Sequence, residues 1–264
     1  FRFWSSKRFD GELIRRMLRY GLPNGLQMLG DALAFMIFMM LVGRLGKTEL
    51  AATNLAFNLN MLVFIPMLGM GTAVTILVGQ RIGEGRSHLG ARSTWLAFAV
   101  TGGWTLLFAA GYLTLPDLIL GPFRAKSDPA EFARLEPVVK SLLIFIAIYS
   151  LFDALMVIFG SAIRAAGDTR FSLLMTLFSA WFVMVLPVAV MEMNGSLTLR
   201  RCWYACSVHI IFLGILFLLR FLYGPWRTMK VIEDEITPES HQVEPRSAGF
   251  FESESGHPNV SVSS

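Results

Sequence analysis

Residues 149–170 read YSLFDALMVIFGSAIRAAGDTR, an apolar run that ends in a short charged turn. The apolar part continues a longer hydrophobic stretch, and about 20 such residues in a helix cross the hydrocarbon core of a bilayer. Asp153 lies inside this stretch. A charged side chain at membrane depth costs roughly 2.5–3.5 kcal/mol on insertion scales, and such residues are mostly kept for a function. This segment therefore predicts a membrane-spanning helix that carries a functional carboxylate.

The composition of the whole chain also indicates a membrane protein. Of its 264 residues 54% are hydrophobic and 16% are charged, and the mean hydropathy is +0.56. Soluble domains carry about 25% charged residues. The sequence has no phosphate-binding loop, no metalloprotease or serine-hydrolase motif and no Cys/His set at metal spacing, so we do not expect an enzyme. Cys202 and Cys206 have a helical spacing that seldom fits disulfide geometry, and we expect them to be packing residues.

Six apolar stretches are each long enough to cross a bilayer. They predict an all-α membrane protein, a bundle of six transmembrane helices within residues 23–230, whose first helix starts at Pro23. Residues 1–22 predict a basic amphipathic helix at the membrane surface or a connector between two membrane bundles. Residues 231–264 are acidic and poor in apolar periodicity, which predicts a disordered cytoplasmic tail. The expected spans are 23–42, 54–79, 93–115, 138–164, 171–191 and 200–222.

Lys and Arg are unequally distributed between the two sets of loops. The loops on the side of the N-terminus carry 14 of these residues, and the loops on the opposite side carry 8. Cytoplasmic loops hold the excess in membrane proteins, so both ends of the chain are predicted to lie in the cytoplasm. The pair Arg200 and Arg201 lies on the less basic side and opposes this assignment. Because the basic excess borders membrane spans, it indicates topology and not a nucleic-acid partner.

Two intramembrane carboxylates are the main candidate site. Asp31 lies about eight residues into the first span, and Asp153 lies about fifteen residues into the fourth. Such a group must pair, protonate or bind a cation, because desolvation disfavours the bare ion. Tyr149 is one helical turn before Asp153 and shares its face. The alternative is that each Asp bonds a polar side chain on a neighbouring helix.

Other polar and flexible positions are weaker candidates. Gln27 is one turn before Asp31, and Asn58 is the most inward-facing asparagine of the second span by spacing. Gln27 is neutral, so helix–helix hydrogen bonding explains it nearly as well as substrate contact, whereas for Asn58 helix packing is the favoured role over substrate contact. Pro66 removes a backbone hydrogen bond and the nearby Gly69 and Gly71 loosen packing, so a bend or hinge is expected there.

Two connecting segments carry further expectations. Asp128 followed by Pro129 and Glu131 predicts a helix start, with a capping side chain, a first-turn proline and an early acid. The residues 164–170 predict a cytoplasmic turn that fixes topology, with Asp168 paired to Arg170.

Together these motifs resemble the C-terminal lobe of MATE (multidrug and toxin extrusion) transporters, and NorM-like members in particular. The resemblance covers about residues 10–230, and its most specific part is the fourth span with the turn after it. The motifs that carry it are Gly21-Leu-Pro23, Gln27, Asp31, Val42-Gly-Arg-Leu-Gly46, Glu49-Leu-Ala-Ala52, Phe64-Ile-Pro66, Gly69, Gly71, Val78-Gly-Gln80, Gly83-Glu-Gly-Arg86, Phe152-Asp-Ala154, Gly160-Ser-Ala-Ile-Arg164, Gly167-Asp-Thr-Arg170, Trp181 and Pro187.

The resemblance implies one lobe of a twelve-helix fold, and a secondary active antiporter that exports drug-like, often cationic compounds in exchange for Na+ or H+. It implies that Asp31, Asp153 and Tyr149 form the cation site, with both Asp residues as Na+ ligands if the coupling ion is sodium. We therefore predict that the two carboxylates face each other across the first and fourth spans. No other cofactor is expected. The partners implied are the lipid bilayer, drug-like substrates and an N-terminal lobe that this chain lacks, and the place is the bacterial inner membrane.

The sequence departs from the family pattern at three positions. Asp31 stands where many members have Glu, Met156 where a Gln is common and Ala165 where a Gly is common. None of these changes removes a charge, but the choice between Na+ and H+ stays open. Two other functions also stay open: a flippase for a lipid-linked precursor, for which we expect more basic residues in the spans, and a membrane interaction protein that does not transport, because a single lobe has no cleft between lobes.

Overall fold

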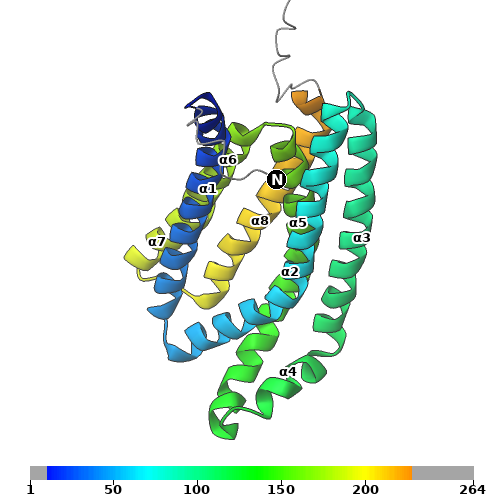
Figure 1. Ribbon diagram of the computed structural model, residues 1–264. Coiled ribbons are helices and arrows are strands. Elements are labelled where there is room, and N and C mark those ends of the chain that lie inside the picture. The colour runs from blue at the N-terminus through cyan, green and yellow to red at the C-terminus, as the bar shows by residue number, and fades with distance from the viewer. Residues whose placement is uncertain (1–10, 228–264) are drawn as a thin grey trace, which may run out of the picture. The chain divides into compact units, whose positions relative to one another are not determined.

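Helices make up the fold throughout the part of the chain that the computed structural model describes, residues 11–227 (Figure 1). These residues belong to one packed unit. The helices are α1 (Gly11–Gly43), α2 (Lys47–Gly83), α3 (Ser87–Thr114), α4 (Pro116–Arg124), α5 (Pro129–Ala165), α6 (Thr169–Phe178), a π-helix η1 (Ser179–Val185), α7 (Leu186–Met193), α8 (Leu199–Tyr223) and a short 3₁₀ turn η2 (Pro225–Arg227).

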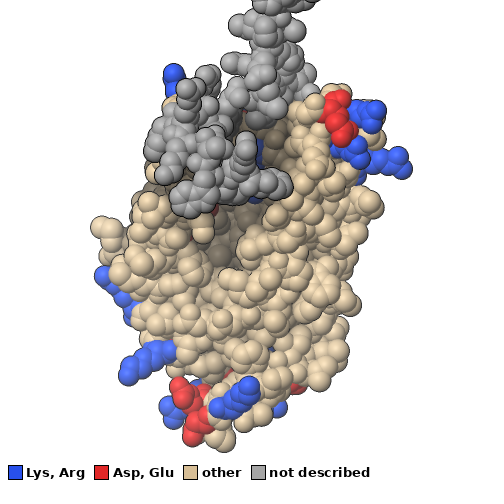
Figure 2. Space-filling view, in the orientation of Figure 1, with Lys and Arg blue, Asp and Glu red and all other residues tan. Residues whose placement is uncertain are grey.

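Six helical segments of the described chain are long and apolar enough to cross a membrane, as predicted. Figure 2 shows charged side chains gathered toward the two ends of one face, with a broad uncharged band between them. Such a band matches the hydrocarbon core of a bilayer. The spans are Gly25–Gly43, Lys47–Gly83, Ser87–Thr114, Pro129–Ala165, Thr169–Met193 and Leu199–Tyr223.

The predictions for the two ends of the chain can be compared with the structure only in part. Helix α1 begins at Gly11 and runs through Pro23, so the expected helix start at that proline is wrong. The second half of the predicted linker 1–22 is therefore continuous with the first span. Residues 1–10 and the predicted tail 231–264 lie outside the described residues.

Helix α5 is the central element of the bundle. It packs against α2, α3 and α8, while α1 packs mainly against α6 and η1 (Figure 1). Two helix crossings on α5 depend on glycine, because small residues let helix backbones approach closely. A Cβ added at Gly71 of α2 would lie 2.9 Å from Val157, and one added at Gly214 of α8 would lie 2.5 Å from the carbonyl oxygen of Phe152.

These contacts bear on the predicted hinge in α2. The helix continues through Pro66 without interruption, and Figure 1 shows it changing direction along its length. A Cβ at Gly69 would meet no atom within 4 Å, whereas Gly71 fits closely against α5. Packing against α5 therefore explains Gly71 directly, and the hinge role of Pro66, Gly69 and Gly71 stays a prediction.

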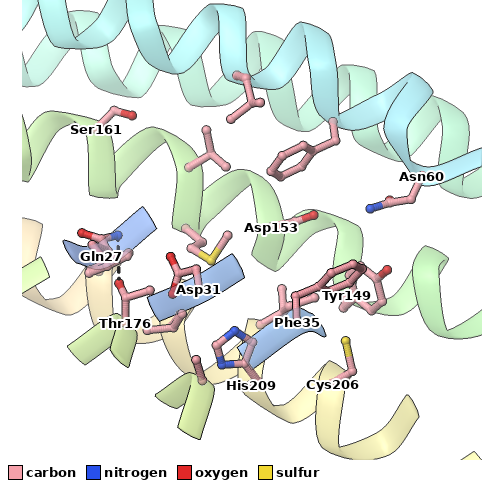
Figure 3. A pocket seen from close by; sticks show the side chains of 18 of the residues that line it. Gln27, Asp31, Phe35, Asn60, Tyr149, Asp153, Ser161, Thr176, Cys206 and His209 are labelled. Carbon is pink, nitrogen blue, oxygen red and sulfur yellow. Dashed lines mark hydrogen bonds between the residues drawn. The ribbon is translucent and has the colours of Figure 1, made fainter. Parts of the chain in front are cut away.

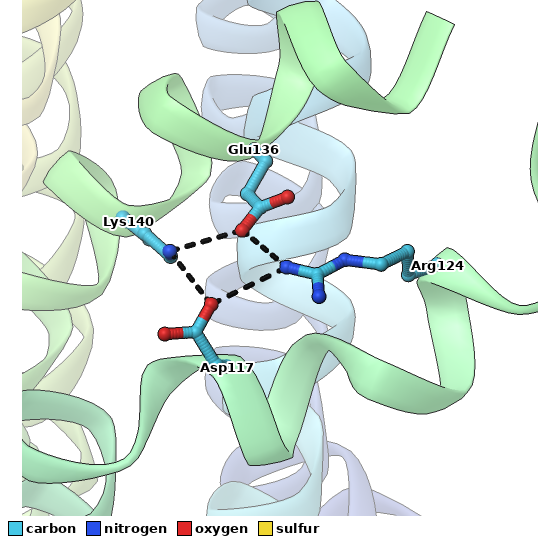
Figure 4. Close-up of polar contacts among 4 residues, drawn as sticks. All are labelled: Asp117, Arg124, Glu136 and Lys140. Carbon is cyan, nitrogen blue, oxygen red and sulfur yellow. Dashed lines mark hydrogen bonds and ion pairs between the residues drawn. The ribbon is translucent and has the colours of Figure 1, made fainter. Parts of the chain in front are cut away.

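The connection between α3 and α5 is held by an ion-pair network (Figure 4). The Lys140 ammonium lies 2.8 Å from an oxygen of Asp117 and 2.9 Å from one of Glu136, and Arg124 contacts the same two carboxylates. The hydrogen bond from Lys140 holds the pKa of the exposed Asp117 carboxyl below its ordinary value. The network ties the short helix α4 to the first turns of α5, whose start at Asp128 is capped as predicted by hydrogen bonds to its side chain.

The turn between α5 and α6 differs from the prediction. Asp168 is buried and its carboxylate accepts hydrogen bonds from Arg220 of α8 at 2.7 and 2.8 Å. Arg170 is exposed, so the predicted pairing of Asp168 with Arg170 is wrong. The reason is geometric: residues two apart at a helix start do not face each other. The turn thus joins α5 and α6 to the end of the last span.

Candidate functional site

A cavity of about 780 Å³ lies between α1, α2, α5, α6, η1 and α8 (Figure 3). Its wall is mostly apolar, with aromatic side chains such as Phe35, Phe57 and Phe64. A few polar side chains interrupt this wall, and they come from different helices. Apolar pockets with a small number of convergent polar groups are the usual form of small-molecule sites.

Tyr149 and Asp153 enter the cavity from α5, one helical turn apart. Both side chains are buried, Tyr149 completely and Asp153 to within 4%. The Tyr149 hydroxyl makes no hydrogen bond within the described residues. Burying a hydroxyl without a partner is unfavourable, so a partner from the cavity is expected when the site is in use.

Asp31 reaches the same cavity from α1 (Figure 3). One of its carboxylate oxygens is buried and lacks a hydrogen-bond partner among residues 11–227. Within that range three buried side-chain oxygens have no partner, and two of them, on Asp31 and Tyr149, line this cavity. The alternative was that each Asp bonds a polar neighbour. This oxygen of Asp31 has no such neighbour among the described residues.

The two neutral candidates, Gln27 and Asn58, lie in different places. Gln27 lines the cavity one turn from Asp31; its amide nitrogen donates to Thr176 at 3.3 Å and its oxygen accepts from Ser172 at 3.3 Å. Asn58 is exposed and lies outside the cavity wall, where Asn60 stands instead. Two residues span about 200° around a helix, so the predicted inward face of α2 was nearly opposite to the face that lines the cavity.

Arg164 lines the cavity, although the sequence predicts that it belongs to a cytoplasmic turn. Its guanidinium donates to Ser161 at 3.1 Å and to Ser172 at 3.4 Å. Helical side chains lean toward the helix N-terminus, so an arginine in the last turn of α5 reaches back into the bundle. A Cβ at Gly160 would lie 3.1 Å from its Nη1, so Gly160 leaves the space for this group. Small residues one turn before Arg164 were the signal available in the sequence.

Polar groups from α8 complete the wall. His209 lines the cavity, and its Nδ1 lies 2.8 Å from the hydroxyl of Ser179 in η1. Cys206 also lines it and, like Cys202, is a buried free thiol. Within the described chain no three His, Cys, Asp or Glu side chains form a group that could hold a metal ion. Asp31 and Asp153 are the acidic side chains of the cavity wall within the described residues, and the Tyr149 hydroxyl adds a neutral oxygen.

Comparison with known proteins assigns the fold to a family. A sequence profile for the family described as MatE matches residues 23–191. The chain belongs to the MATE family. Its members are transporters and not enzymes, and the chain is a multi-pass membrane protein.

Curated relatives of this MATE chain include bacterial NorM proteins. It is 34% identical over 170 residues to the "Probable multidrug resistance protein NorM" of Xanthomonas axonopodis pv. citri, covering 64% of this chain and 36% of that protein. It is 33% identical over 190 residues to the protein of the same name from Xanthomonas campestris pv. campestris, covering 67% and 40%. The chain thus spans less than half the length of these relatives.

Solved MATE structures share the fold. The structure titled "Outward-facing conformation of a multidrug resistance MATE family transporter of the MOP superfamily" superposes with a TM-score of 0.71 at 20% identity, covering 85% of this chain and 48% of that one. The six-span bundle therefore matches about half of a MATE transporter, as expected for one lobe.

Proposed function

We propose that this MATE chain is the C-terminal lobe of a secondary antiporter in a bacterial inner membrane, with both ends in the cytoplasm. The antiporter exports drug-like, often cationic compounds in exchange for Na+ or H+. The NorM relatives, whose names describe multidrug resistance, support the substrate class. The excess of Lys and Arg on one set of loops supports the orientation.

One observation carries the proposal: Asp31, Asp153 and Tyr149 line one largely apolar cavity, and oxygens of Asp31 and Tyr149 are buried there without partners. A carboxylate that has lost its water is stabilised by a proton, a metal cation or a cationic ligand. All three compete for the same negative charge. Binding one of them therefore disfavours the others, which is the differential affinity that exchange requires.

The apolar part of the cavity suits the second substrate. Aromatic faces attract cations, and flexible Met side chains adapt to differently shaped apolar groups. Phe35, Phe64, Met61 and Met156 all line the wall. The cavity thus combines negative charge with an adaptable apolar surface, which fits amphipathic cations.

The coupling ion is the finer part of the proposal. Na+ would take Asp31 and Asp153 as ligands, with Tyr149 as a neutral oxygen donor, whereas H+ would need only the carboxylates. Tyr149→Phe separates these cases, because it removes a ligand oxygen and leaves both carboxylates in place. A transporter driven by Na+ should lose coupling in this variant, and a transporter driven by H+ should keep it.

The test uses the full-length protein in vesicles with an imposed ion gradient. Asp153→Asn should abolish ion-driven efflux of a fluorescent cation and leave membrane insertion intact. Asp128→Asn is the matched control, because it removes a carboxylate outside the cavity and Asn caps a helix as well as Asp. Undiminished efflux by Asp153→Asn would refute the assignment of the site.

One observation bears on the lipid-flippase alternative: Arg164 places a guanidinium on the cavity wall, where a pyrophosphate could bind. Two carboxylates share that wall, so the formal charge favours a cation. Transfer of an anionic lipid-linked precursor by the vesicles, with no efflux of cations, would support the flippase. A full-length protein that binds neither ligand would support an interaction protein.

A further inference from the structure

Arg164 differs from the other polar groups of the cavity because it brings positive charge to a site that we propose for cations. A guanidinium stays protonated under all ordinary conditions. Its position near the C-terminus of α5 also favours a positive charge, because the helix dipole is negative at that end. The charge of this side chain is therefore a permanent property of the cavity.

Among residues 11–227, the direct contacts of Arg164 do not include a carboxylate. Its hydrogen-bond partners within the described residues are the hydroxyls of Ser161 and Ser172, which are neutral. In the part of the chain that the structure describes, it has no ion pair within 4.0 Å. Asp31 is the acid whose charge acts on it most directly, across the cavity. The guanidinium is thus held in place by hydroxyls and not neutralised by a carboxylate in contact with it.

The network around Arg164 also fixes its position. Ser172 receives a hydrogen bond from Arg164 and donates one to Gln27, which in turn donates to Thr176. This series of hydrogen bonds joins α5, α6 and α1 on one side of the cavity. Gly160 gives the guanidinium the space that a larger residue would take. These contacts hold the guanidinium on the cavity wall.

The formal charge of the described cavity follows from this inventory. Asp31 and Asp153 contribute two negative charges and Arg164 contributes one positive charge. The formal net charge of the described cavity is therefore −1. A ligand with one positive charge balances the site, and a ligand with two positive charges leaves an excess that repels the guanidinium.

We propose that Arg164 determines cargo charge: it makes the cavity accept monovalent organic cations and discriminate against divalent ones. This inference rests on the proposed function, since it concerns the cations that the antiporter moves. It assigns to Arg164 a role in specificity and not in the coupling reaction. Removing the guanidinium should let a second positive charge into the cavity.

The experiment compares two dyes that share one ring system, ethidium with a single fixed charge and propidium with two. Initial efflux rates of both are measured in vesicles that contain the full-length protein. In Arg164→Gln the propidium-to-ethidium ratio of rates should rise roughly tenfold or more, because charges interact far more strongly in a water-poor site than in bulk water. Arg164→Lys keeps the charge and should keep the ratio of the unmodified protein.

Two further variants separate charge from structure. Arg170→Gln removes an exposed charge from the same turn and should leave the ratio unchanged. Asn60→Asp adds a negative charge to the cavity wall, on α2, at constant size and should raise the ratio with Arg164 intact. This second route keeps the proposal testable if Arg164→Gln does not fold.

The outcomes are distinct. A higher ratio in both Arg164→Gln and Asn60→Asp supports the proposal. An equal loss of the efflux rates of both dyes in Arg164→Gln, with no change of ratio in Asn60→Asp, overturns the proposal. Arg164 would then be a structural link between helices. Failure of the unmodified protein to move either dye would refute the proposed function itself.

Discussion

The crossing of α5 and α8 makes a quantitative prediction about Gly214→Ala. The new Cβ would lie 2.5 Å from the carbonyl oxygen of Phe152 and 3.2 Å from its Cα, whereas ordinary contact begins at 3.4 Å. The atoms that must move belong to the backbone of α5 and cannot rotate away as a side chain would. The helices must therefore separate by close to an ångström, and such overpacking lowers the free energy of unfolding by about 1–3 kcal/mol.

Thermal unfolding of the purified full-length protein in detergent checks this prediction. Each kcal/mol lowers Tm by roughly 2–4 °C in a chain of 150–250 residues and by less in a longer one, so in the full-length protein Gly214→Ala should melt about one to a few degrees below the unmodified protein. Phe152 adjoins Asp153, and the displacement of α5 should also reduce ion-driven efflux.

The matched control is Gly103→Ala in α3. A Cβ at Gly103 would meet no atom within 4 Å, and alanine is favoured over glycine in a helix interior by up to about 1 kcal/mol. This variant should melt at the temperature of the unmodified protein or above it. Equal melting temperatures for the two alanine variants would refute the close approach of α5 and α8.

Three further contacts can be tested in the same way. Tyr112→Phe removes a buried 2.9 Å hydrogen bond to a carbonyl of α2 and should reduce the free energy of unfolding by about 1 kcal/mol; Tyr149→Phe should not, because its hydroxyl has no partner, and equal losses would contradict this. Asp117→Asn should lower Tm at neutral pH. Because the fold lowers the pKa of Asp117, the difference in Tm between the variant and the unmodified protein should disappear as pH falls through that lowered pKa, below the ordinary value of about 4. A difference in Tm that grows in acid would contradict the network. Arg220→Met leaves the buried Asp168 carboxylate without its partner and should reduce the free energy of unfolding by about 3 kcal/mol; an unchanged Tm would show that the pair contributes little.

Local information in the sequence was sufficient for the helices and for part of the cavity wall. The length of each apolar run predicts six spans, and helical periodicity places Tyr149 and Asp153 on one face. The cap at Asp128 is likewise a local pattern. The shared cavity of Asp31 and Asp153 required the family resemblance, because nothing near either residue in the sequence indicates which helices become neighbours.

Long-range pairing and side-chain direction could not be obtained in this way. Asp168 pairs with Arg220, which is 52 positions away, and the nearer Arg170 faces elsewhere. Arg164 stands at the end of a span, where charge counting assigns it to a loop. Its direction depends on the lean of helical side chains and on the space at Gly160, both of which are properties of the packed bundle.

The π-helix Ser179–Val185 sets the rotational phase of the fifth span. A π-turn holds more residues than an α-turn, and such insertions often occur at functional sites. Thr176 before it meets Gln27, while Val188 after it packs in the apolar cluster with Phe38 of the same α1 helix. Deleting one residue from the π-helix would restore a continuous α-helix and rotate everything after it by about 100°. The span would then keep either its polar contact at the cavity or its apolar contact with α1. The extra residue thus lets one helix make both contacts.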